Sequence, residues 1–244
     1  MFSARWLRAW TEAASGLIYP PHCAVCGEAV GPLAAGLCRS CRRARQRLGG
    51  SRCAVCGQPY SGAITADFRC LNCGDRDLSF DFATAAYRSR GVVRDLIHQF
   101  KYNRRTHLRP LLARMLVEGF RDPRLHGKMP SALVPVPLHP TRQREREFNQ
   151  AEVLARLAGS RLGLPVDDCL QRTRYTLTQT HFHRDERFEN LEGAFALRAG
   201  ADVTGRDLVL VDDVLTTGST ADACARVLRE AGASSVVVIT VARG

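Results

Sequence analysis

The residues best suited to chemistry stand near the end of the chain, in the run LVLVDDVLTTGST at 208–220. Its first four residues are apolar and predict a buried parallel strand, and Asp212 and Asp213 stand where that strand should end. A helical pattern follows from 221 to 231. The turn between the acids and the helix is rich in hydroxyls and contains Thr216, Thr217, Gly218, Ser219 and Thr220. A strand, such a turn and a helix N-terminus together predict an anion site.

The chemistry expected at this turn follows from its backbone and its charges. The first N–H groups of a helix have no partner within the helix, and the helix dipole favours negative charge beside them. Gly218 permits close approach of a ligand to the backbone. Asp212 and Asp213 would repel a phosphate, so they suit sugar hydroxyls or a magnesium ion. The alternative is a Walker B strand, which requires a P-loop, and the sequence has no G-x-x-x-x-G-K-[ST] motif.

A second stretch, ALVPVPLHPTRQREREFNQ at 132–150, combines apolar and basic residues. We expect a buried strand over its first seven residues, then a basic loop with Arg142, Arg144 and Arg146, then a helix over 149–162. Guanidinium forks match phosphate oxygens, so the loop predicts a pyrophosphate site. An ordinary solvent-exposed basic loop is the alternative.

The elements that must position these residues alternate along the chain. The pattern predicts a strand at 80–88, helices at 90–101 and 107–121, and a last buried strand at 235–241. Strands alternating with helices predict an α/β fold in which a parallel sheet has helices on both faces. Lys101, at the end of the first of these helices, is a candidate ligand contact, although such a charge run is more often a solvated face.

Residues 171–195 are polar and show no clear periodicity. So long a loop inside a compact domain is usually functional or disordered, and in a transferase it would be a flexible lid over the reacting groups. His181 and His183 lie in this stretch. We interpret both as loop residues, because no cysteine or carboxylate stands in register with them for a metal site.

Ten cysteines are present, and eight of them form four C-x-x-C pairs. CAVCG occurs twice, at 23–27 and 53–57, and a C-x-x-C-G turn is typical of a zinc knuckle. The repeat favours two structural zinc sites with sequential pairing, while a crossed pairing, redox chemistry and iron–sulfur ligation are the alternatives. The expected ligands of the first site are Cys23, Cys26, Cys38 and Cys41. Those of the second are Cys53, Cys56, Cys70 and Cys73.

Composition and charge limit the ligand and the cellular location that the sequence predicts. The chain has 244 residues and a net charge of +11, with the middle of the sequence its basic part, which suits a polyanionic ligand. Arg8 and Glu12 interrupt any apolar signal-peptide core, and no stretch reaches the roughly 18 apolar residues that a membrane span needs. We therefore expect a cytoplasmic protein. Residues 1–20 predict an amphipathic helix that packs on the body or docks on a partner or membrane surface.

The run VLVDDVLTTGST resembles the 5-phosphoribosyl-1-pyrophosphate (PRPP) motif of type I phosphoribosyltransferases. This resemblance implies that Asp212 and Asp213 contact the ribose 2- and 3-hydroxyls. It also implies that the turn at 216–220 holds the 5-phosphate, and that PRPP binds with magnesium. The fold class implied is a type I phosphoribosyltransferase-like α/β sheet, preceded by a small four-cysteine zinc-ribbon module.

Nearly the whole chain is similar to the ComF family of competence-associated, phosphoribosyltransferase-like proteins. YPPHCAVCG, LIHQFKY, VPVPLHPTRQREREFNQ and LVLVDDVLTTGST carry this resemblance. The family usually has Arg-Gly-Phe-Asn-Gln, whereas this chain has Glu147 in place of the glycine. The expected organisation is a double zinc ribbon over 21–75 and a phosphoribosyltransferase-like domain over 80–244.

Two functional hypotheses follow. The first is an enzyme that transfers the phosphoribosyl group of PRPP to a nitrogen acceptor and releases pyrophosphate. The second is a non-catalytic factor in transformation, in which the PRPP fold and the zinc ribbon bind single-stranded DNA and work with the competence machinery. The two are not exclusive, and the sequence names neither the acceptor nor the oligomeric state.

Overall fold

The computed structural model describes residues 22–31, 36–64, 68–74, 76–102, 105–127, 129–175 and 184–244. The helix expected over 1–20 lies outside these ranges, as do His181 and His183. Within the described ranges, no helix has the length and apolarity that a membrane crossing needs.

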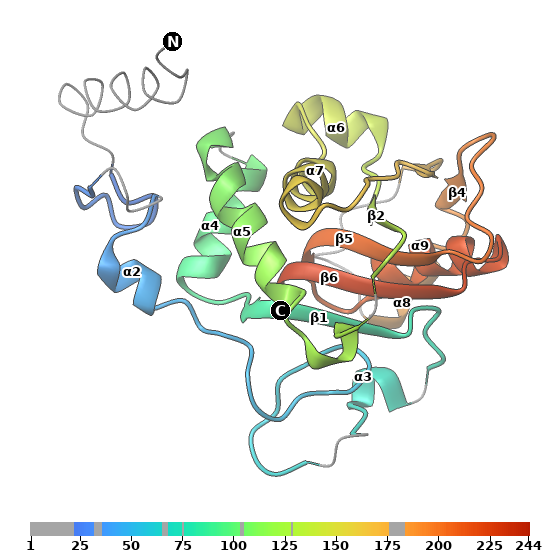
Figure 1. Ribbon diagram of the computed structural model, residues 1–244, viewed down its shortest axis with the longest axis horizontal. Helices are drawn as coiled ribbons and strands as arrows, with labels where there is room; N and C mark the ends of the chain where they lie inside the picture. Colours follow the sequence, from blue (N-terminus) through green and yellow to red (C-terminus); the bar gives the residue numbers. More distant parts are fainter. Residues whose placement is uncertain are drawn as a thin grey trace.

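A four-stranded parallel sheet forms the centre of the molecule (Figure 1). Its strands are β1 (Phe82–Arg88), β2 (Ala132–Pro135), β5 (Asp207–Leu215) and β6 (Ser235–Arg243), in the order β1-β6-β5-β2. Each neighbouring pair is parallel. These segments are rich in Val, Ile, Leu and Ala, as expected for strands that are buried on both faces.

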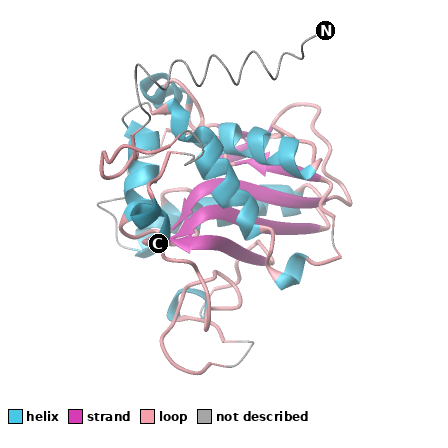
Figure 2. Ribbon diagram, turned by 60° about the vertical axis from the view of Figure 1, so that its left-hand side comes forward, coloured by secondary structure: helices cyan, strands magenta, loops and turns pink. Residues whose placement is uncertain are grey.

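Helices cover both faces of the sheet (Figure 2). Helices α5 (Arg109–Gly119) and α7 (Gln150–Leu162) contact one face, and α9 (Ser219–Glu230) contacts the other. Strand residues alternate between the two sides, so that Val209 and Val211 pack with the first group of helices and Leu208 and Leu210 with α9. The predicted fold class is confirmed.

Two stretches differ from the sequence prediction. The basic segment expected as a loop is a short helix, α6 (Pro140–Arg146). Its N-terminus is fixed by Pro140 at the first position and by His139, whose Nδ1 accepts a hydrogen bond from the Thr141 N–H at 3.2 Å. A helix this short, polar or charged at each position after Pro140, carries no apolar periodicity that would reveal it.

The stretch expected as one polar loop contains three regular elements. Strands β3 (Leu170–Arg172) and β4 (Phe195–Leu197) pair in antiparallel fashion, and α8 (Arg184–Glu189) lies between them in the chain. Between β1 and β2 the chain also forms helix α4 (Val92–Tyr102) and two 3-10 helices, η2 (Thr106–Leu108) and η3 (Pro123–Leu125). Residues 176–183 of the expected lid lie outside the described ranges.

Before the sheet, the two CAVCG segments adopt the same turn. The Cys23 N–H donates to the Glu28 carbonyl at 2.7 Å, and the Cys53 N–H donates to the Gln58 carbonyl at 2.8 Å. Each segment is followed by a short helix, α2 (Arg39–Arg43) or α3 (Leu71–Gly74), and the second cysteine pair has one member directly before the helix and one within it. In Figure 1, α3 lies by the β1 edge of the sheet, whereas α2 lies beyond α4, away from the sheet.

Candidate functional site

A cleft of about 370 Å³ opens where the parallel strands end. In a parallel sheet all carboxyl ends lie at one edge, which is where ligands of such folds bind. Most of its walls come from the end of β5 with the start of α9, from helix α4, and from the segment between Val136 and Ala151, and Ser89 and Arg172 complete them. The acids, the hydroxyl turn and the basic segment that the sequence singled out therefore meet at one place.

The two acids form the floor of this cleft. Strand β5 continues four residues past Val211 to Leu215, so both acids lie within the strand and not after it. The Asp213 side chain is buried and makes an ion pair with Lys101, the Oδ1–Nζ distance being 2.8 Å. The Asp213 N–H donates to Asp212 Oδ1, also at 2.8 Å. This leaves Asp212, only partly buried, facing the cleft.

The environment raises the pKa of both Asp212 and Lys101, which favours the neutral form of the carboxyl group and the charged form of the amine. Burial and the neighbouring Asp213 carboxylate together raise the pKa of Asp212 to about 7, against the opposing charge of Lys101. Burial alone would lower the pKa of Lys101, but the Asp213 and Asp212 carboxylates outweigh it and raise that pKa. Lys101 therefore stays charged beside Asp213, while Asp212 gains a proton below about pH 7.

The hydroxyl turn wraps around a small hollow of about 30 Å³ beside the acids. Gly218 has φ of +90° and ends the turn at the first residue before α9, a conformation that L side chains rarely adopt. The Thr217 and Ser219 hydroxyls lie 3.1 Å apart, and Thr216 and Thr220 line both the hollow and the larger cleft. The first residues of α9 line this hollow. The unpaired N–H groups and the dipole of this twelve-residue helix therefore favour negative charge there.

Two of the three predicted arginines line the cleft. Arg142 and Arg146 are four residues apart and so share one face of α6, whereas Arg144 is exposed and is not among the described residues that line the cleft. The expectation that all three arginines bind the pyrophosphate stays a prediction, and the helix places Arg144 on another face than Arg142 and Arg146. Arg146 is positioned by Gln150, whose Oε1 accepts from Nη1 at 3.2 Å, and by the Tyr102 ring, 5.1 Å from its guanidinium.

Sequence reasoning missed Arg172 and His98 among the residues of the cleft. Arg172 on β3 reaches it from a stretch that was interpreted as a loop, and its guanidinium lies over the Phe195 ring. His98 and Tyr102, one helical turn apart on α4, form an aromatic wall with ring centroids 4.8 Å apart. Tyr102 is 58% exposed. The four-residue spacing of this pair was the one local signal that could have indicated them.

Glu147 occupies a glycine-like position. Its φ is +68°, and among the described residues it is the only non-glycine with positive φ. It ends α6 in the left-handed conformation for which glycine is preferred. The departure from the family's glycine therefore retains the backbone turn and adds strain to it.

Eight cysteines gather into two sets of four, in the predicted sequential pairing. Within each set the sulfur atoms lie within 4.8 Å of one another. The Cys26–Cys38 and Cys56–Cys70 Sγ distances are both 3.6 Å, close to the roughly 3.8 Å edge of a tetrahedron with Zn–S bonds of about 2.3 Å. Both sets therefore fit structural zinc with no open coordination position.

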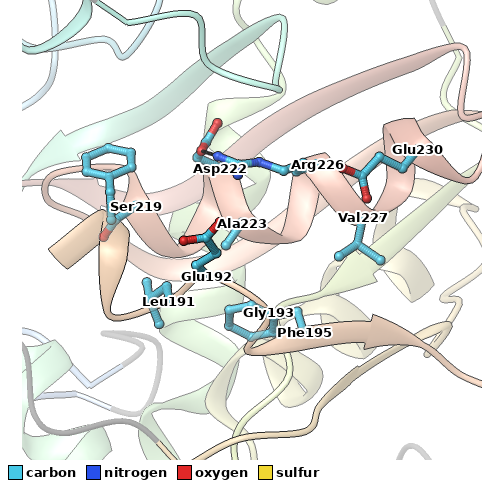
Figure 3. Close-up of a pocket in the computed structure, with 11 residues that line it drawn as sticks. Leu191, Glu192, Gly193, Phe195, Ser219, Asp222, Ala223, Arg226, Val227 and Glu230 are labelled. Carbon is cyan, nitrogen blue, oxygen red and sulfur yellow. Dashed lines mark hydrogen bonds and ion pairs between the residues drawn. The ribbon is translucent and has the colours of Figure 1, made fainter. Parts of the chain in front are cut away.

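A separate groove of about 240 Å³ lies between α9 and the segment from Phe188 to Phe195 (Figure 3). Its wall includes Asp222, which accepts hydrogen bonds from Arg226 Nη2 at 3.1 Å and from the Ser79 N–H at 2.7 Å. These contacts tie the first turn of α9 to the segment preceding β1. The groove shares Ser219 with the hollow at the turn and has none of the acids that face the cleft.

Comparison with known proteins agrees with this geometry. Residues 14–75 match a family model described as a double zinc ribbon domain, and residues 149–244 match one described as a phosphoribosyl transferase domain. The fold and the sites thus define a zinc-ribbon protein with a phosphoribosyltransferase-type α/β sheet.

Whole-chain relatives narrow this class. Competence protein F of Haemophilus influenzae is 32% identical over 217 residues, covering 85% of this chain and 90% of that protein. DNA utilization protein YhgH of Salmonella typhimurium is 35% identical over 207 residues, covering 83% and 88%. Competence protein ComFC of Bacillus subtilis is 27% identical over 216 residues, covering 85% and 84%. The chain belongs to this ComF family of competence and DNA-utilization proteins.

Proposed function

We propose that the cleft binds PRPP with magnesium and that the chain transfers the phosphoribosyl group to a nitrogen acceptor. One observation carries this proposal: an acidic pair, an anion-binding turn and two arginines line a single cleft at the carboxyl edge of a parallel sheet. Each of the three fits a different part of PRPP, namely the ribose hydroxyls, the 5-phosphate and the pyrophosphate.

The residues would divide the work as follows. Asp212 and Asp213 accept hydrogen bonds from the ribose hydroxyls, and the ion pair with Lys101 holds the Asp213 side chain in place. The turn from Thr216 to Thr220 holds the 5-phosphate in the hollow at the start of α9. Arg142 and Arg146 hold the pyrophosphate. Bound magnesium would neutralise part of the pyrophosphate charge, and the oxygens nearest to it would be those of the acidic pair.

In the transfer itself the bond between ribose C1 and pyrophosphate oxygen breaks, and pyrophosphate leaves with the electron pair. The acceptor nitrogen forms the new bond to C1. The positive charge that develops on the ribose is favoured by the acids beneath it. His98 and Tyr102 offer an aromatic wall on which a flat acceptor base would stack.

Binding tests this proposal first. We expect calorimetry to detect PRPP binding by the zinc-loaded chain in the presence of magnesium, and Asp212→Asn with Asp213→Asn to abolish it. Arg144→Gln is the matched control, because Arg144 is exposed and does not line the cleft. Unchanged affinity in the double variant, with the fold verified by thermal melting, would contradict the assignment.

A second candidate function is the binding of single-stranded DNA. It is favoured by the exposed side chains of Arg39, Arg42 and Arg43 on α2, and by the competence and DNA-utilization names of the relatives. If several arginines contact phosphates, the logarithm of DNA affinity should fall with the logarithm of salt concentration with a slope of about −0.7 per contact. A flat salt response, or no binding at low salt, would remove this candidate.

A further inference from the structure

Arg243, at the end of β6, joins the second four-cysteine site to the strand that leads into the phosphate turn. The side chain is buried, with the residue 3% exposed. On one side its Nε donates to the Cys56 carbonyl at 2.8 Å and its Nη2 contacts Cys56 Sγ at 3.3 Å. On the other side its Nη1 donates to the Leu215 carbonyl at 3.0 Å and to the Gly244 carbonyl. One guanidinium thus reaches a zinc ligand and the last residue of β5.

The position of Leu215 gives this contact its consequence. Leu215 directly precedes Thr216, the first residue of the phosphate turn, and its carbonyl also accepts a hydrogen bond from the Gly244 N–H at 2.8 Å. Two donors at the carboxyl end of β6 therefore fix the point at which the chain leaves the sheet to form the anion-binding hollow. A substitution of Arg243 would therefore first alter the conformation of this turn.

The charge of Arg243 requires a buried partner. A guanidinium is always ionised in proteins, and a buried charge without a counter-charge is strongly destabilising. Four thiolates around a zinc ion carry a formal charge of −2, and Cys56 Sγ presents this charge to Arg243. If the metal leaves, the four sulfurs are no longer held together, and the Cys56 carbonyl and sulfur that contact Arg243 lose their fixed position. The hydrogen bonds of Arg243 to Cys56 and to Leu215 then weaken together.

The first four-cysteine site has a different neighbourhood. Cys26 is exposed, and its Sγ lies 4.0 Å from Glu28 within its own turn. The Cys38 sulfur lies 2.9 Å from the Ser40 hydroxyl and accepts from the Cys41 N–H, both again local partners. Within the described part of the chain, the polar contacts of these sulfurs stay inside the first ribbon.

We propose that Arg243 is a positioning residue that couples zinc at the second site to the phosphate turn, so that this zinc holds residues 216–220 ready for an anion. Loss of zinc from the second site loosens the turn, whereas loss of zinc from the first site leaves it unchanged. The identity of the anion rests on the proposed function, but the coupling itself does not. Coupling of this kind is reciprocal in affinity, so an anion bound at the turn strengthens binding of the second zinc, and slower release of that ion is the expected readout.

The first measurement follows hydrogen exchange of the segment 216–220 without any ligand. The full chain is compared with both zinc ions bound, with the first site removed by Cys23→Ser and Cys26→Ser, and with Arg243→Met. We expect faster exchange in Arg243→Met and unchanged exchange in the first-site variant. Equal exchange in all three proteins would overturn the proposal. Arg243→Lys, which keeps the charge but loses the fork, should be intermediate and serves if Arg243→Met does not fold.

The second measurement follows zinc release into a chromophoric chelator, with inorganic phosphate and then PRPP as probes. With either anion bound, we expect release of one zinc ion to slow by roughly fivefold or more, as is usual for coupled sites. The first-site variant should retain this effect and Arg243→Met should lose it. An anion that binds without slowing any release, or that slows both ions equally, would overturn the coupling. If PRPP does not bind but exchange still responds to Arg243, the proposed function fails and the coupling stands.

Discussion

The two four-cysteine sites begin with the same five residues and lie in different surroundings. The cysteines of the second site are each at most 1% exposed, whereas those of the first include the exposed Cys26. The Val55 carbonyl accepts from the Ala83 N–H at 2.6 Å, which joins the second knuckle to the central sheet. Arg124 reinforces the junction by donating to the Ala54 carbonyl at 2.5 Å.

The first ribbon is attached by the segment that follows it. Leu48 donates its N–H to the Ala86 carbonyl and the Gln46 carbonyl accepts from the Arg88 N–H, both at 2.8 Å. Arg45 and Arg47 lie over the ring of Tyr87. The difference shows that one zinc motif can serve two purposes: the second site is part of the scaffold of the cleft, and the first carries a basic surface outward.

The largest difference between the two sites is expected on removal of a ligand. Cys56→Ser should destabilise the whole chain by about 3 kcal/mol or more, because it removes a metal whose binding energy is folding energy and leaves Arg243 without its partner. Cys26→Ser should leave the main unfolding transition nearly unchanged. Thermal denaturation with zinc counting checks this pair, and equal losses would mean that both ribbons are integral to the domain.

A smaller loss is expected at the charged cluster that fastens the second ribbon. Asp122 is 6% exposed and binds Arg52 at 2.8 Å and Arg124 at 2.9 Å. Asp122→Asn should cost about 2 kcal/mol, since two partly exposed guanidinium groups lose their buried acceptor. The matched control is Asp95→Asn, because Asp95 is half-exposed and pairs only loosely with Arg94.

Asp122 also makes the stability of the fold depend on pH under acidic conditions. Burial opposes ionisation of Asp122, but hydrogen bonds from Arg124 outweigh it and hold the pKa of Asp122 well below its usual range. A depressed carboxyl pKa contributes stability above about pH 4 that is lost as the pH falls further. Denaturant unfolding of the wild type should therefore weaken more steeply below pH 4 than that of Asp122→Asn. If the free energies of unfolding of the two proteins fall equally with pH, another group controls stability in acid.

A modest effect concerns the cleft and its dependence on pH. Because the pKa of Asp212 is raised to about 7, the carboxylate that would accept ribose hydroxyls is lost below that pH. PRPP affinity should fall by at most about tenfold per pH unit as the solution is acidified below pH 7. Removal of the first zinc site should not alter this profile. Affinity that is flat between pH 5 and 8 would show that Asp212 does not bind the ligand in its ionised form.

The smallest expected effect compares the same glycine in the two knuckles. Gly27 and Gly57 both have positive φ, but a Cβ on Gly57 would lie 3.0 Å from the Ala83 carbonyl oxygen, whereas one on Gly27 meets nothing within 4 Å. Gly27→Ala should cost about 1 kcal/mol from strain alone. Gly57→Ala should cost somewhat more, because it also pushes the knuckle from β1. Denaturant unfolding of both variants measures the difference directly.

Local patterns predicted much of this molecule. The apolar run before Asp212 gave the strand, the glycine and hydroxyls gave the turn, and the repeat of CAVCG gave both cysteine sets in the pairing observed. These features depend on neighbours within a few residues. The helix over Pro140–Arg146 was missed for the same reason, since α6 lacks the apolar periodicity by which a helix is predicted.

Contacts between distant residues were not predictable. Lys101 and Asp213 are far apart in sequence, and only the packing of α4 beside β5 brings them together. Arg243 follows a run of buried apolar residues, and nothing next to it in the chain indicates that Cys56 and Leu215 will be its partners. Such pairs depend on topology, which one sequence specifies only through the whole fold.

The most direct test of PRPP binding at the cleft is calorimetric dissection of the ligand. PRPP, ribose 5-phosphate and pyrophosphate are each titrated, with magnesium, into the zinc-loaded chain. We expect PRPP to bind at least about tenfold more tightly than either fragment, because one molecule then occupies the phosphate turn and the arginine side together. No binding of PRPP, or PRPP affinity no greater than that of ribose 5-phosphate, would contradict a cleft built for the whole molecule.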